Sequence, residues 1–139
     1  MAATPVACGN ATATQAGASI TASKVGEPAA WYLAPGQNLQ SSSRTFTALV
    51  SRVDCNNGIT GEVLTPEVRS TGAKVIVAFT VAAKQAEYGL CQGNNKVPYQ
   101  VDLGEPWDDR TLVDGLCLTA DKALARSIFC ASGATRLEP

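Results

Sequence analysis

The chain of 139 residues contains no histidine. Without histidine, neither a Ser-His-Asp nor a Cys-His catalytic arrangement can form, and every zinc site that uses an imidazole ligand is excluded. A general acid or base would have to be an Asp, Glu, Lys or Tyr side chain, usually with a perturbed pKa. No pair of acids stands out, so we expect no catalytic activity and no cofactor.

Aromatic residues and one-sided charge are also scarce. Aromatic residues make up 6% of the chain, so the core must depend on Val, Ile and Leu with a few rings. The net charge is −1 with both signs scattered, and no basic cluster of the kind that neutralises phosphates is present, which argues against nucleic-acid binding. No apolar run approaches the roughly 18 residues that span a bilayer, so we expect no transmembrane segment.

Five cysteines are present, and none belongs to a CxxC pair, so redox motifs and zinc knuckles gain little support. Well-separated cysteines in a small domain indicate disulfides and an oxidising compartment. Residues 1–10 (MAATPVACGN) lack the charged start and apolar stretch of a signal peptide. We therefore expect the chain to begin after a removed signal, in an extracellular or cell-envelope protein. The alternative is a cytoplasmic protein with reduced thiols.

The length suits one domain. Residues 1–17 are mostly Ala, Thr, Gly and Asn, which predicts a flexible N-terminal tail, and residues 18–139 form the folded domain. In residues 73–83 every second side chain is apolar, and residues 97–103 alternate equally well. Asn56-Asn57-Gly58 and Ser70-Thr71-Gly72 predict turns, the second of them in a hairpin. The expected strands are residues 20–22, 31–33, 44–53, 59–68, 73–83, 97–103 and 111–113.

Residues 119–129 (TADKALARSIF) break this pattern, because their helix-forming residues carry apolar side chains at helical spacing. Thr119 is the expected N-cap of one short C-terminal helix. Several short strands, frequent turns and one small helix predict an all-β fold, an antiparallel β-sandwich with the immunoglobulin-like arrangement as its specific form. A closed small barrel is the alternative.

The middle of the chain carries a distinctive series of motifs: CQGN from Cys91, VPY from Val97, LGEP from Leu103, and R-x-LVDG from Arg110. This series resembles a group of uncharacterised secreted or lipid-anchored small domains of actinobacteria, over roughly residues 30–117. In that group the position of Trp107 is usually small and Leu-like, and the next position is usually Gly. Here Trp107 and Asp108 stand instead, so we expect this turn to differ.

The resemblance implies a Cys55–Cys91 bridge, because some members of the group carry only those two cysteines. Cys117 and Cys130 would then pair. A continuous helix between them would hold their Cα atoms about 20 Å apart, whereas a disulfide needs roughly 4.4–6.8 Å. Either the helix is short and the chain doubles back, or Cys117 pairs with Cys91; we favour the first arrangement.

Cys8 is then the odd cysteine. A lipid attached to Cys8, followed by the flexible tail, would tether the domain to a membrane. Against this, Pro5-Val6-Ala7 is a poor lipobox, because Leu is expected three residues before the cysteine. A free or intermolecular thiol is the alternative.

Aromatic and acidic residues supply the candidate binding site. Trp107 lies between a proline and two acids, which makes it the best candidate for an exposed ring. The candidate binding residues are Trp107, Asp108, Asp109, Trp31 and Tyr32, with core packing as the alternative for the rings. The acids around Arg110 could bind Ca²⁺, but no EF-hand spacing is present, so we expect Arg110 to pair with them and no metal to bind.

Together these features predict a non-catalytic secreted or cell-envelope domain that binds a protein or a wall component. Two alternatives are a small extracellular hydrolase that uses acidic residues and a carbohydrate-binding module. Exposed coplanar Trp or Tyr rings would favour the carbohydrate module, and a pair of acids in a pocket would favour the hydrolase.

Overall fold

The computed structural model describes residues 26–84 and 89–139. The predicted tail, Cys8 and residues 20–22 lie outside these ranges. Within them no helix has the length and apolar character needed to cross a membrane. The elements are β1 (Gly26–Leu33), β2 (Thr45–Arg52), β3 (Glu67–Ser70), β4 (Lys74–Ala82), β5 (Val97–Asp102), β6 (Thr111–Asp114), η2 (Gly115–Leu118), α3 (Lys122–Ala125), η3 (Ile128–Cys130) and β7 (Thr135–Leu137).

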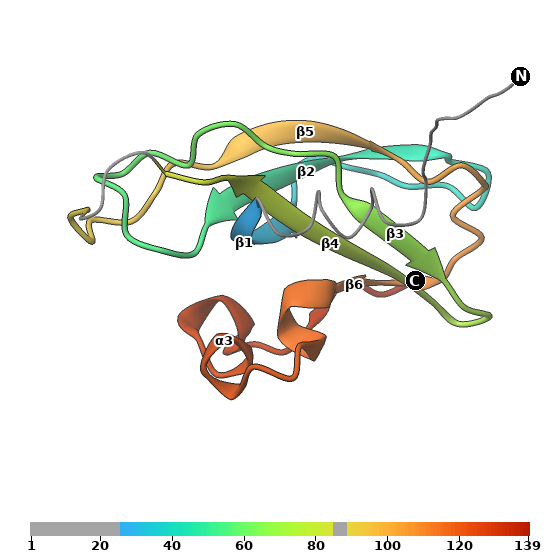
Figure 1. The fold of residues 1–139 in the computed structure, drawn as a ribbon. Coiled ribbons are helices and arrows are strands. Elements are labelled where there is room, and N and C mark those ends of the chain that lie inside the picture. Colours follow the sequence, from blue (N-terminus) through green and yellow to red (C-terminus); the bar gives the residue numbers. More distant parts are fainter. Residues whose placement is uncertain (1–25, 85–88) are drawn as a thin grey trace, which may run out of the picture.

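The fold is all-β, as predicted, but the sheet is mixed and open (Figure 1). Its strands follow the order β5-β2-β1-β4-β6-β7, and β3 pairs with β4 outside this path. The expected purely antiparallel pairing is wrong, because β6 runs parallel to β4. Three antiparallel pairings link β5 to β4 through β2 and β1, so β5 runs opposite to β4. The chain reverses direction between β5 and β6, and β6 therefore runs in the same direction as β4.

One edge of β4 is divided between two strands. β6 pairs with Lys74–Val77, and β1 pairs with Phe79–Ala82. Where β1 leaves this edge, its Trp31 donates the indole N–H to the Val77 carbonyl at 2.8 Å. The Trp31 backbone N–H is bound by the Asp114 carboxylate at 3.0 Å. Side chains thus satisfy the backbone groups that strand pairing leaves open at this junction.

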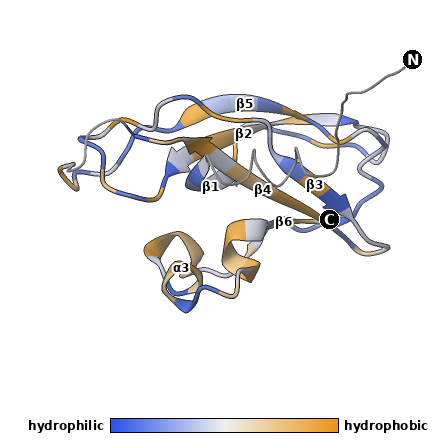
Figure 2. Cartoon of the chain, in the orientation of Figure 1, coloured by the Kyte–Doolittle hydropathy of each residue, from blue (hydrophilic) through white to orange (hydrophobic). Residues whose placement is uncertain are grey.

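The main core lies on one face of the sheet. In β4 the buried residues alternate strictly, as predicted, and place Val75, Val77, Phe79 and Val81 in the core. β5 alternates as predicted too, with Val101 buried and Gln100 exposed. The remaining members of this core are Ala29, Trp31, Phe46, Ala48, Val50, Leu103, Trp107 and Leu112. In Figure 2 the apolar colour runs along β4.

The other face of the sheet carries a second, smaller core. Ala30 points away from the main core and packs against Leu116 and Cys130. These two residues belong to the segment 115–133, which comprises η2, α3 and η3 and is called here the C-terminal cap. Gly115 begins the cap close to β4, where an added Cβ would lie 2.8 Å from the Ala78 Cβ. Only glycine permits this approach, which seats the cap on the sheet.

The C-terminal helix is shorter than predicted. It covers Lys122–Ala125, and its N-cap is Asp121 rather than Thr119. The Asp121 carboxylate accepts hydrogen bonds from the backbone N–H groups of Ala123 and Leu124, so the helix begins two residues late. After Ser127 the chain forms a 3₁₀ turn and returns to Cys117.

Two strand predictions also need correction. Residues 59–68 contain only an isolated bridge from Val63 to Val81 and the first residues of β3. The strand expected at residues 31–33 is longer, because β1 begins at Gly26 and ends at Leu33. The 70–72 turn joins β3 and β4 in the predicted hairpin.

Candidate functional site

The predicted exposed tip is folded onto itself. Trp107 has 4% of its surface exposed, so the prediction of an exposed ring is wrong. Its side chain joins the main core and donates its indole N–H to the Arg110 carbonyl, and its backbone N–H binds the Ser43 carbonyl at 2.7 Å. Trp31 is fully buried as well. The two tryptophans are therefore packing residues.

The two acids beside Trp107, Asp108 and Asp109, shape and stabilise the turn. Asp108 and Asp109 are exposed and lie in the left-handed backbone region, with φ of 57° and 56°, which suits Asp better than most residues. The Asp109 carboxylate accepts a hydrogen bond from the Ser41 hydroxyl at 2.6 Å. Within the described residues, no group of three or more Asp, Glu or Cys side chains could hold a metal ion.

Arg110 pairs with an acid, as predicted. Its guanidinium lies 2.9 Å from Glu105 and also binds the carbonyls of Trp107 and Pro106. A hydrogen bond from Ser70, and then the Arg110 guanidinium, hold the pKa of Glu105 below its ordinary value. This arrangement orders the turn.

Both favoured disulfides are present. Cys55–Cys91 joins residues 53–61 to residues 89–96, called here the stapled loops, with 4.5 Å between the Cα atoms. The Asn94 amide donates to the carbonyls of Arg52 and Asp54 at 3.0 and 2.7 Å. The stapled loops therefore bind each other tightly through asparagine side chains and the disulfide.

A buried arginine anchors the stapled loops. The Arg52 side chain, 2% exposed, forms an ion pair with Glu27 and donates to the carbonyls of Thr60 and Ala82. All three partners belong to the loops or to neighbouring strands. The Arg52 guanidinium is thus occupied in holding backbone, which is a structural role.

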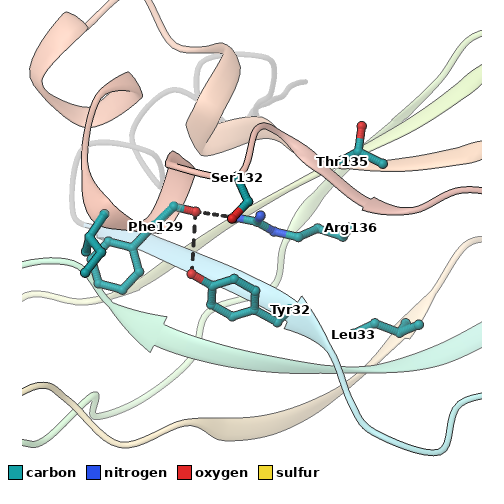
Figure 3. A pocket seen from close by; sticks show the side chains of 7 residues that line it. Tyr32, Leu33, Phe129, Ser132, Thr135 and Arg136 are labelled. Atoms are coloured by element: carbon teal, nitrogen blue, oxygen red, sulfur yellow. Dashed lines mark hydrogen bonds between the residues drawn. The ribbon is translucent and has the colours of Figure 1, made fainter.

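Cys117–Cys130 closes the C-terminal cap with a Cα separation of 5.6 Å, so the chain doubles back as one of the alternatives required. Where the cap meets the sheet, a pocket of about 350 Å³ opens (Figure 3). It is called here the Tyr32 pocket. Its lining comes from β1, from the end of the cap and from β7, and consists of Tyr32, Leu33, Ile128, Phe129, Ser132, Thr135 and Arg136.

Arg136 builds the wall of this pocket. Its Nε group donates to the Trp31 carbonyl, and its Nη2 group donates to the Phe129 carbonyl at 2.9 Å. The same Nη2 atom lies 3.0 Å from Asp114, and the guanidinium carbon sits 4.4 Å from the centre of the Tyr32 ring. Arg136 thereby joins β1, β6, β7 and the cap at one point.

Asp114 supports Arg136 from behind and is fully buried. Burial raises the pKa of Asp114 above its ordinary value, although hydrogen bonds from the backbone N–H groups of Trp31 and Leu116, and the Arg136 charge, favour the ionised form. Among the described residues, the lining of the Tyr32 pocket includes no carboxylate. The pocket therefore does not offer the two acids that general acid–base hydrolysis requires.

Part of the lining of the Tyr32 pocket is apolar. Ile128 is 83% exposed, the largest exposure among the described large apolar residues, and Phe129 and Leu33, which also line the pocket, are half-buried. In Figure 3 the Tyr32 hydroxyl points toward the Phe129 carbonyl, with which it shares a hydrogen bond of 3.5 Å. The pocket can accept an apolar side chain from outside.

Of the predicted binding residues, only Tyr32 lies in this pocket. Sequence reasoning missed Arg136, Ile128 and Phe129. Arg136 is a single charge near the chain end, and its contact with the Trp31 carbonyl spans 105 residues. Ile128 falls within the helix predicted over residues 119–129, and the local pattern gives no sign that the helix ends at Ala125. Comparison of the chain with protein-family models, with curated proteins and with solved structures finds no match.

Proposed function

We propose that this protein is a non-catalytic, secreted or cell-envelope domain that binds another protein through the Tyr32 pocket. The observation that carries the proposal is Ile128, an exposed isoleucine in the lining of a pocket that also contains the apolar and aromatic side chains of Leu33, Tyr32 and Phe129. Exposed apolar groups gathered around a concave site are typical of interaction sites. The two disulfides support a location in an oxidising compartment.

The alternatives gain less support from the same geometry. A carbohydrate module would use open aromatic faces, yet both tryptophans lie in the core. The Tyr32 ring has the Arg136 guanidinium at 4.4 Å and the Lys96 ammonium at 5.2 Å from its centre, which limits the room for a stacked sugar. A hydrolase would need acids in the pocket, and Asp114 is held behind Arg136.

Affinity capture from the native cell envelope tests the proposal. The full chain and its Ile128→Asp variant serve as baits, with Ile59→Asp as the matched control. Ile59 is 58% exposed in the stapled loops, so both substitutions place the same charge at an exposed isoleucine. We expect a protein that is retained by the parent and by Ile59→Asp and is lost with Ile128→Asp. Equal retention by the two variants would contradict a role for the Tyr32 pocket.

A further inference from the structure

The stapled loops are held together by hydrogen bonds as well as by their disulfide. The Asn57 backbone N–H donates to the Leu90 carbonyl at 3.0 Å, and the Leu90 N–H donates to the Asn57 side-chain oxygen at 2.8 Å. The Asn95 N–H donates to the Gly58 carbonyl at 2.9 Å. These hydrogen bonds connect one loop to the other, so they hold the two cysteines near each other even when the sulfurs are not joined.

The C-terminal cap depends more strongly on its disulfide. Its helix α3 has four residues, whereas an isolated helix shorter than roughly 12–15 residues is marginal in water. Within the described part of the chain, residues 119–127 form hydrogen bonds only with other residues of the cap. The second core has three buried residues, and Cys130 is one of them. The bond to Cys117 therefore fixes much of the cap on the sheet.

Arg136 gives the Cys117–Cys130 pair a second distinctive feature. Its Nη2 atom lies 3.8 Å from the Cys117 sulfur. A neighbouring guanidinium stabilises a thiolate, and stabilising the thiolate favours the reduced form of a cysteine pair. The Asp114 carboxylate, 3.0 Å from the same nitrogen, offsets part of this effect. The remaining attraction acts on the cap disulfide in the same direction as the weak internal hold of the cap.

We propose that Cys117–Cys130 is a redox switch that opens the cap. Reduction by a dithiol frees the segment between the two cysteines, and the sheet and the Cys55–Cys91 disulfide stay intact. Ile128 and Phe129 belong to the freed segment and line the Tyr32 pocket, so the pocket is lost when the cap opens. The inference concerns the cap itself and does not depend on what the pocket binds.

The exchange takes place in two steps. A thiolate of the reductant attacks the Cys117 sulfur, which is half-buried, and Cys130 leaves as a thiolate and takes up a proton. The second thiol of the reductant then attacks the mixed disulfide, and Cys117 leaves as a thiolate beside Arg136. The protein gains two electrons and two protons, and the dithiol is oxidised to its own disulfide.

Equilibration of the full chain with mixtures of reduced and oxidised dithiothreitol tests the order of reduction. The chain carries Cys8→Ser, so that the odd thiol cannot exchange. After an acid quench, alkylation and mass spectrometry give the reduced fraction of each cysteine pair. Cys91 is exposed, so the reductant reaches both bonds, and the measurement compares their equilibria.

We expect the Cys117–Cys130 pair to be half-reduced at a ratio of reduced to oxidised dithiothreitol about tenfold lower than the Cys55–Cys91 pair. For two electrons this corresponds to a reduction potential about 30 mV higher. Reduction of both pairs at the same ratio, or of Cys55–Cys91 first, would overturn the inference.

Trypsin reports whether the cap opens while the sheet remains folded. Lys122 and Arg126 are exposed in the cap, and Lys74 is exposed at the start of β4. In the mixture that reduces only the cap pair, cleavage after Lys122 and Arg126 should accelerate about tenfold or more, and Lys74 should stay uncut. An unchanged cleavage rate in the cap, or cleavage at Lys74 at the same time, would contradict a local switch.

Two double variants provide the matched comparison without reductant. Cys117→Ser with Cys130→Ser should be cut in the cap as fast as the reduced parent. Cys55→Ser with Cys91→Ser also lacks one disulfide but keeps the cap bond, so its cap should resist trypsin as the oxidised parent does. If the two variants are cut in the cap at equal rates, the cap disulfide is not the switch. Should either variant fail to fold, the titration of the parent still decides the order of reduction.

Discussion

Two buried arginines serve two disulfide-closed regions in different ways. Arg52 and Arg136 each bind several backbone carbonyls and one carboxylate. The partner of Arg52 is Glu27, which is partly exposed, whereas the partner of Arg136 is Asp114, which is fully buried. Arg52 holds loops that close on themselves, and Arg136 holds a cap that leaves a pocket. A buried arginine that binds backbone carbonyls thus holds the stapled loops together in one region, and lines the Tyr32 pocket in the other.

The largest expected effect is the loss of stability when the carboxylate partner of each arginine, Asp114 or Glu27, is removed. Asp114→Ala should lower the free energy of unfolding by about 3–5 kcal/mol, because it leaves the buried Arg136 charge without its partner. Glu27→Ala should cost clearly less, because water can reach the place of the lost carboxylate beside Arg52. Urea unfolding of both variants at neutral pH measures the difference. Equal losses would show that burial of the acid does not distinguish the two regions.

Removal of either disulfide should lower stability, but only removal of Cys117–Cys130 should also abolish partner binding. By the chain-entropy relation, opening the Cys55–Cys91 loop of 36 residues costs about 4 kcal/mol, and opening the Cys117–Cys130 loop of 13 residues costs about 3 kcal/mol. Replacing each pair by serine should therefore lower the unfolding free energy by similar amounts. Because Ile128 and Phe129 lie inside the shorter loop, only its loss should abolish capture of the partner. Capture assays on both variants, below their melting temperatures, test this difference, and loss of capture with both variants would contradict it.

A smaller effect tests the asparagines of the stapled loops. Asn94→Ala removes two hydrogen bonds to the carbonyls of Arg52 and Asp54, which should cost about 1–3 kcal/mol. Asn38→Ala, at an exposed asparagine, is the control and should change little. Partner capture should be the same for both. A loss of capture with Asn94→Ala would mean that the two regions are coupled.

The smallest effect concerns pH. The pKa of Asp114 is raised by burial, so the folded state binds more protons than the unfolded state between the unfolded pKa, about 3.9, and the folded pKa. The stability of the parent relative to Asp114→Asn should therefore increase as pH falls through this window.

The contribution of Glu105 to stability should change with pH in the opposite direction, because the pKa of Glu105 is lowered. Its contribution is present above the unfolded pKa, about 4.3, and is lost as pH falls through the folded pKa. Urea unfolding of Asp114→Asn and Glu105→Gln across this range checks both signs.

Local patterns predicted much of the sheet. The alternation in β4 and β5 and the turn at residues 70–72 depend on neighbouring residues, so the sequence displays them directly. The resemblance implied the Cys55–Cys91 bridge. The parallel pairing of β6 with β4 was not predictable, because a four-residue strand carries no sign of its partner.

The pocket was beyond sequence reasoning for a similar reason. Tyr32 and Arg136 meet only because β1 leaves the edge of β4 and β7 returns beside β6. Trp107 was predicted to be exposed because of its proline and acidic neighbours, yet those neighbours form a turn that places the ring in the core. An aromatic residue between turn-forming residues is therefore a poor guide to exposure in this chain.

The position of β5 has one further consequence. It is the last strand on its side of the sheet, and the Leu103 N–H binds the Arg44 carbonyl, so alternate residues of β5 direct their amides toward β2. Pro98 falls on the opposite set, where the amides face outward, and it has no N–H to offer. A strand from another molecule that approached this border would find one of its carbonyls unmatched. Pro98 thereby disfavours the addition of a further strand at the β5 edge of the sheet.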